Sequence, residues 1–138
     1  MLKKLKVQGI TILVSTPYMD EANLCERIAL IQNGKIMSVD TPANIIKSYP
    51  EKLFAAKSDN IYKLLKDFRA HAEVNSCFAF GEFIHITVKD QTKNGLDALN
   101  RIAAENKHTS IQIKEIEPGI EDSFILLMSQ HPEATKNN

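Results

Sequence analysis

The chain has 138 residues, of which 43% are hydrophobic and 25% charged, a composition typical of an ordinary globular chain with one domain or two small ones. Its 17 basic and 17 acidic side chains cancel, so it lacks the broad positive field that non-specific binding to nucleic acid or an anionic membrane usually requires. Apolar runs fall well short of the roughly 18 residues of a membrane span, and the basic N-terminus lacks a secretion signal's apolar region. We therefore expect a cytoplasmic chain with no nucleic-acid partner.

The first predicted element is the apolar run that starts at Ile10 and ends at Val14, between Gly9 and the polar residues Ser15 and Thr16. Continuous apolar, β-branched runs of this length are typical of strands that are buried on both faces of a parallel sheet. Without neighbouring strands, such a segment offers a long apolar edge. We therefore expect the chain to self-associate through this strand.

A short helix is expected next, over residues 17–26. Thr16 can cap this helix, and Pro17 suits its first position because that position needs no backbone N–H. Asp20 and Glu21 would lie near the positive end of the helix dipole. Capping therefore explains this adjacent acidic pair better than acid–base catalysis does, since adjacent helical residues point apart.

A β-hairpin is predicted after this helix. Residues 27–32 and 35–39 flank Asn33-Gly34, a dipeptide strongly favoured in two-residue hairpin turns. A second short helix over residues 43–48 follows, bounded by prolines on both sides.

From about residue 50 onward, strand and helix patterns alternate in an order that can be counted. The apolar residues of the first helix recur at helical spacing on one face, and one strand alternates apolar with polar positions. The expected elements are strands at 52–57, 77–80, 83–88 and 111–114, helices at 61–72 and 95–105, and a closing helix at 120–129. The order β-α-β-β-α-β predicts a ferredoxin-like arrangement, an antiparallel sheet with both helices on one face.

The predicted organisation is thus an α+β chain in three parts. Residues 1–49 form the first part, and residues 50–130 form the ferredoxin-like domain. Residues 131–138 are polar and are expected to be a disordered tail.

Three stretches of the sequence carry recognisable motifs. Residues 12–22 read ILVSTPYMDEA, residues 25–42 read CERIALIQNGKIMSVDTP, and residues 117–124 read EPGIEDSF. The first two resemble the S-T-H-x-M-x-E-A and C-D-R-I-A-x-I-x-x-G-x-I-x-x-x-G-T-P stretches that end the ATP-binding domain of ABC transporters. The third is similar to the P-x-L-E-D-x-F close of the accessory domain that follows it in exporter-type subunits.

This resemblance implies that the intact subunit binds ATP and Mg²⁺ and drives export through a separate membrane permease subunit. Hydrolysis by this family needs a glycine-rich P-loop, a Walker B acid and a signature loop, and the sequence contains no G-x-x-x-x-G-K-[ST]. Pro17 stands where the family has a histidine that reaches the terminal phosphate, and proline cannot donate a hydrogen bond. We therefore expect no catalytic or cofactor-binding residues, no enzyme activity from this chain alone, and a regulatory or dimerisation role.

The sequence predicts no metal site and no other catalytic site. The four histidines are scattered over helix, strand, loop and tail, at His71, His85, His108 and His131. Cys25 and Cys77 are far apart and outside a C-x-x-C pair, which predicts two buried thiols rather than a disulfide or a zinc site. Ser15 and Ser123 lie outside any G-x-S-x-G motif, so a hydrolase triad is not indicated.

Two alternatives for the ferredoxin-like part remain open. It can be a small-ligand regulatory module, with a polar pocket on the sheet face or at a dimer interface. An RNA-recognition module shares the same element order, but it would place aromatic and basic residues on the central strands. Phe78, Phe80 and Phe83 come without such basic residues beside them, which disfavours RNA binding.

Overall fold

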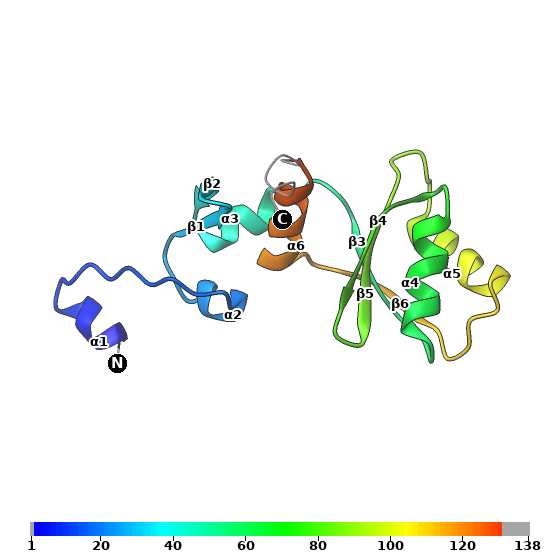
Figure 1. The fold of residues 1–138 in the computed structure, drawn as a ribbon, viewed down its shortest axis with the longest axis horizontal. Coiled ribbons are helices and arrows are strands. Elements are labelled where there is room, and N and C mark those ends of the chain that lie inside the picture. The colour runs from blue at the N-terminus through cyan, green and yellow to red at the C-terminus, as the bar shows by residue number, and fades with distance from the viewer. Residues whose placement is uncertain (1, 131–138) are drawn as a thin grey trace. The chain divides into compact units, whose positions relative to one another are not determined.

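The computed structural model describes residues 2–130, which form two compact units (Figure 1). Unit 1 combines the chain up to Ser48 with the chain from Ile120 onward, and unit 2 spans Tyr49–Gly119. Both units contain helices and antiparallel strands, which confirms the α+β prediction. No helix within residues 2–130 has the length and apolar character needed to cross a membrane. The predicted disordered tail, residues 131–138, lies outside the described residues.

Unit 1 is built around a β-hairpin and short helices. Its elements are α1 (Leu2–Val7), α2 (Met19–Ala22), β1 (Ile28–Gln32), β2 (Lys35–Asp40), α3 (Pro42–Lys47) and α6 (Ile120–Gln130). The hairpin turn places Asn33 at φ 49° and Gly34 at φ 74°, the left-handed conformations that a two-residue hairpin turn requires. Thr41 caps α3, since its Oγ1 accepts a hydrogen bond from the Asn44 N–H at 3.2 Å. The predicted hairpin and the short helix after it are therefore confirmed.

The small core of unit 1 joins the hairpin to α3 and α6. Ile28 and Leu30 on β1, Ile45 on α3 and Ile120 on α6 form one buried cluster. The buried Ser123 hydroxyl on α6 donates to the Ile45 carbonyl at 3.3 Å, which ties the two helices together. α6 therefore packs with elements from the first part of the chain.

This packing differs from the boundary expected from sequence. From the sequence we assigned the closing helix to the domain of residues 50–130, because the helix directly follows the last predicted strand of that domain. In the structure α6 returns to unit 1 and supplies Ile120 to its core. The apolar partner of a helix depends on contacts between distant parts of the chain, and the helical pattern alone does not identify that partner.

The apolar run from Ile10 to Val14, called segment 10–14 below, does not form the predicted strand. Ile10 is 48% exposed, Leu13 98% and Val14 47%. Among residues 2–130, the N–H groups of residues 11–15 have no backbone acceptor. A strand exists only when a neighbour pairs with it, and in the described residues β1 and β2 form a two-stranded sheet by themselves. The prediction of a strand buried on both faces is therefore wrong for this chain.

Unit 2 contains a four-stranded antiparallel sheet and two helices. Its elements are β3 (Leu53–Lys57), α4 (Ile61–Ala70), β4 (Val74–Phe80), β5 (Phe83–Val88), α5 (Gly95–Glu105) and β6 (Gln112–Ile116). The strands lie in the order β4-β5-β3-β6. The chain order is the β-α-β-β-α-β order expected from the sequence. Assignment to the ferredoxin-like fold family stays a prediction.

The core of unit 2 lies between the sheet and its helices, which cover the same side of the sheet (Figure 1). Phe54 faces Ile86 and Ala56 faces Ile84 across β3 and β5, so these four side chains share one face of the sheet. The helices contribute the fully buried side chains Leu64, Phe68, Leu99 and Ile102. The intervening side chains of the same strands point to the opposite face of the sheet, because successive side chains of a strand alternate between the two faces.

Asparagines start both helices of unit 2. Asn60 Oδ1 accepts from the Lys63 N–H at 3.0 Å, and Asn94 Oδ1 accepts from the Asp97 N–H at 3.3 Å. Gly95 opens α5 where a Cβ would lie only 2.7 Å from the Phe54 ring. A larger residue at this position would therefore require the Phe54 ring or α5 to shift.

Candidate functional site

The segment that resembles the ABC ATPase motif forms an exposed turn followed by a short helix. Thr16 Oγ1 accepts a hydrogen bond from the Tyr18 N–H at 3.0 Å. The same hydroxyl donates to the Glu21 carboxylate. Thr16 is thus fully engaged in local bonds, an arrangement typical of threonine at turns.

α2 is shorter than the predicted helix over residues 17–26. It spans Met19–Ala22, and its N-cap residue Tyr18 makes no side-chain cap. Pro17 precedes the helix, so its expected place at the first helical position is wrong. Asp20 and Glu21 do lie in the first turn, as expected from the helix dipole.

Chemically, this segment offers little to a phosphate group. Pro17 is exposed and presents only its pyrrolidine ring at the position of the family's histidine. The Glu21 carboxylate would repel an anion. In the described range, no group of three or more His, Cys, Asp or Glu side chains could hold a metal ion. The expected absence of catalytic and cofactor-binding residues here stays a prediction.

The described histidines occupy separate places in unit 2. They are His71 after α4, His85 on β5 and His108 after α5. His108 Nε2 lies 2.9 Å from Asp67 Oδ2, and its side chain is only 3% exposed, so this pair has a packing role. His131 lies outside the described residues.

The two cysteines are free thiols in different surroundings. Cys77 is only 4% exposed, and this burial raises the pKa of its thiol to about 12, against the opposing influence of Arg69. Cys25 is half-buried, and its Sγ lies 3.7 Å from the Glu21 carbonyl oxygen. The prediction of two buried thiols is therefore confirmed for Cys77 alone.

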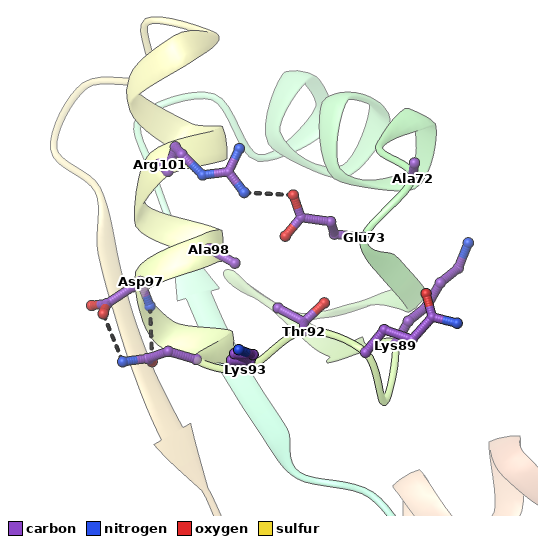
Figure 2. Close-up of a pocket in the computed structure, with 10 residues that line it drawn as sticks. Ala72, Glu73, Lys89, Thr92, Lys93, Asp97, Ala98 and Arg101 are labelled. Atoms are coloured by element: carbon purple, nitrogen blue, oxygen red, sulfur yellow. Dashed lines mark hydrogen bonds and ion pairs between the residues drawn. The ribbon is translucent and has the colours of Figure 1, made fainter.

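Unit 2 contains an open cleft of about 730 Å³ between the α4–β4 turn, the loop after β5 and the start of α5 (Figure 2). Glu73 pairs with Arg101, which raises the pKa of the Arg101 guanidinium. Asn94 Nδ2 donates to Asp97 Oδ2 at 2.6 Å. The other lining residues are Ala72, Lys89, Gln91, Thr92, Lys93 and Ala98.

The cleft is lined by three basic side chains, Lys89, Lys93 and Arg101, and by the two carboxylates of Glu73 and Asp97. Within residues 2–130, neither Lys89 nor Lys93 has an ion-pair partner. Both lie on the loop that leads into α5 (Figure 2). The cleft can therefore offer two ammonium groups to a small anion, and sequence reasoning did not identify it.

A second feature missed from the sequence is the sheet face opposite the helices. Phe80 faces Phe83 across β4 and β5, and His85 stacks on Phe80 with ring centroids 4.2 Å apart and an interplanar angle of 23°. The Nζ atoms of Lys57 and Lys114 lie 5.4 Å and 5.8 Å from the centroid of the Phe83 ring. We call these five residues, together with Phe78 opposite His85, the aromatic–basic face.

The pairing of strands explains why the sequence hid this face. β3 lies between β5 and β6, so it brings Lys57 and Lys114 to Phe83 from distant parts of the chain. The expectation that the phenylalanines lack basic neighbours is therefore wrong. Alternation along the predicted strands is the only sequence signal that would have placed these lysines on that face.

Comparison with known proteins gives a short local match. Over 38 residues the chain is 42% identical to the "Probable multidrug ABC transporter ATP-binding protein YbhF" of Escherichia coli (strain K12), and it matches the Shigella flexneri protein of the same name to the same extent. The match covers 28% of this chain and 7% of each relative, so the chain matches only a small part of their length. No family model and no solved structure matches. The chain therefore has local similarity to an ABC ATP-binding protein.

Cys77 is buried whereas Cys25 is half-buried, and the reactivity of the two thiols tests this difference. At pH 8 only about one Cys77 side chain in ten thousand would be a thiolate, given its pKa of about 12. We expect one rapidly reacting thiol per native chain in a titration with Ellman's reagent, and none in Cys25→Ser. The second thiol should react only after guanidinium unfolds the chain. Rapid reaction of native Cys25→Ser would contradict the burial of Cys77.

Proposed function

We propose that this chain is the C-terminal portion of an ABC transporter ATP-binding protein of the multidrug-exporter type. The local 42% identity to an ABC transporter ATP-binding protein carries this proposal. In the intact subunit, ATP binding and hydrolysis would be coupled to export through a membrane permease subunit. The subunit would then act at the cytoplasmic side of the membrane.

For the chain by itself we propose a regulatory or dimerisation role without ATP hydrolysis. The sequence lacks a P-loop, whose backbone N–H groups and lysine supply the main contacts to phosphates in this family. Thr16 is engaged with Tyr18 and Glu21. Pro17 has no hydrogen bond to donate. These features support an inactive, non-enzymatic fragment.

Self-association would proceed through segment 10–14. Leu13 is 98% exposed, and the backbone N–H groups of residues 11–15 have no backbone acceptor in the described residues. The β1–β2 sheet in the same unit has two strands and therefore two open edges. Its outward side chains include Ile31, 56% exposed, and Ile36, 65% exposed.

Segment 10–14 of one chain could pair as an additional strand with an open edge of the β1–β2 sheet of another chain. Both the hairpin and segment 10–14 carry apolar side chains on their two faces, a pattern typical of strands inside a sheet. Addition of this segment from one chain to the hairpin of a second would satisfy its backbone groups and cover apolar surface. A reciprocal exchange would give a closed, two-fold dimer.

Calorimetry with Mg-ATP tests the non-enzymatic role. We expect no saturable binding tighter than about 1 mM, because a single polar turn without a phosphate cradle gives few contacts. Pro17→His should not create binding, since one histidine does not replace the missing P-loop. Titration of Mg-ATP into buffer gives the heats of dilution, and titration of Mg²⁺ without ATP shows any heat from the metal alone. Saturable binding in the micromolar range would contradict this proposal.

The open cleft in unit 2 favours a second candidate function, that of a small-ligand regulatory module. Lys89 and Lys93 lack ion-pair partners in the part of the chain that the structure describes, while Glu73 is paired with Arg101. The two ammonium groups then face one carboxylate without an ion-pair partner in the described residues, that of Asp97, and this balance favours a small anion over a cation. In this alternative, ligand binding would stabilise unit 2 by mass action.

Inorganic phosphate tests this second candidate. We expect it to raise the melting temperature more for the native chain than for the double variant Lys89→Gln with Lys93→Gln. Phosphate also stabilises proteins through exclusion from their surfaces. A double variant outside the cleft, Lys52→Gln with Lys66→Gln, therefore serves as the control. Equal rises in all three chains would exclude the cleft as an anion site.

A further inference from the structure

We propose that the aromatic–basic face of unit 2 binds short single-stranded nucleic acid. The proposal concerns unit 2 alone and does not depend on a relationship to ABC transporters. The sequence predicted no nucleic-acid partner on two grounds, the zero net charge and the absence of basic residues beside the phenylalanines, and the structure contradicts the second of them. Lys57 and Lys114 lie within 6 Å of the Phe83 ring centroid.

The rings provide stacking surfaces in neighbouring strands. Phe80 and Phe83 are directly opposite each other across β4 and β5, and Phe78 is opposite His85 in the same pair of strands. The four rings therefore belong to one face of the sheet, and all four residues are partly buried. Phe80 and His85 already stack on each other, so Phe83 is the ring on which we expect a base to stack. Nucleobases stack on such rings without regard to sequence, because every base has a π-face.

The lysines provide phosphate contacts beside the rings. Lys114 is exposed and, within the described residues, has no ion-pair partner. Lys57 Nζ lies 2.8 Å from Glu82 Oε2, and Lys57 lowers the pKa of the Glu82 carboxyl. A phosphate would compete with Glu82 for Lys57 and would meet Lys114 without such competition. Both Nζ atoms lie over the Phe83 ring, so a base that stacks there would displace them, and the displaced ammonium groups would remain within reach of its phosphate.

The helices leave this face of the sheet available within unit 2. α4 and α5 pack on the side that carries Phe54 and Ile84. The aromatic–basic face uses the alternate side chains of the same strands. A single strand with splayed bases fits an open sheet surface, whereas a closed pocket would suit a mononucleotide.

The charge of the chain limits the strength of this binding. Its net charge is zero, so attraction comes from the two local lysines and not from a broad field. With two phosphate contacts, the logarithm of the affinity should fall with the logarithm of the salt concentration with a slope of about −1.4. We expect a dissociation constant of about 10 to 100 µM at low salt.

Fluorescence anisotropy with labelled eight-nucleotide oligo(U) and oligo(dT) tests the proposal. We expect saturable binding that Phe83→Ala weakens about tenfold. Phe83→Leu, which keeps apolar volume without a ring, should weaken binding by a similar factor, and a circular dichroism spectrum like that of the native chain would exclude unfolding as the cause. Lys114→Gln should reduce the salt slope by about 0.7. The controls Tyr62→Ala and Lys66→Gln remove an exposed ring and an exposed lysine of α4, and both should bind like the native chain.

Comparison of oligo(U), oligo(dT) and uridine monophosphate shows whether the face prefers RNA, single-stranded DNA or a mononucleotide. Binding of either oligomer with loss in both Phe83 variants supports the proposal, and a preference for oligo(U) indicates recognition of the 2′-hydroxyl. No saturable binding at low salt would overturn it, as would equal affinities of native chain, Phe83 variants and controls. Binding of uridine monophosphate as tight as that of the oligomers would also overturn it, because it would show a mononucleotide site.

Discussion

The backbone groups of a β-strand must be paired, and this requirement governs both units of the chain. In unit 2, four strands satisfy one another in the order β4-β5-β3-β6, and two helices cover one face. In unit 1 the described sheet consists of β1 and β2 alone. Segment 10–14 has the composition of a central strand but has no strand partner among residues 2–130, and Leu13 is 98% exposed.

The two units therefore carry different kinds of information about function. The motifs that resemble an ABC ATPase lie mainly in unit 1, where the turn at Thr16 and the exposed Pro17 offer no phosphate cradle. Unit 2 contains the large core, the open cleft and the aromatic–basic face. The cleft and the aromatic–basic face are surfaces of unit 2 itself, and neither depends on the similarity to an ABC ATP-binding protein.

Local signals in the sequence were sufficient for many of the elements. The strand Phe83–Val88 and the helix Gly95–Glu105 were predicted with the bounds that the structure shows, because alternation and helical spacing are properties of consecutive residues. The turn at Asn33 and Gly34 was likewise predictable, since its left-handed φ angles select those residue types.

The sequence could not predict features that depend on distant parts of the chain. The composition of segment 10–14 predicts a buried strand, but residues 2–130 contain no strand that pairs with it. α6 packs with α3 through Ile120 and Ser123, which no local pattern specifies. Lys57 and Lys114 reach Phe83 only through the register of β5, β3 and β6. The cleft in unit 2 likewise combines three separate segments.

Mass in solution is the most direct test of the claim that unit 1 is an incomplete sheet. Sedimentation equilibrium over a roughly hundredfold range of concentration should show a monomer–dimer equilibrium for the native chain. Leu13→Asp should shift this equilibrium to monomer, because a carboxylate cannot be buried in a paired strand without a large cost. Tyr62→Asp, which changes an exposed residue of unit 2, should not. A monomer at every concentration, or a dimer that Leu13→Asp leaves unchanged, would contradict the account.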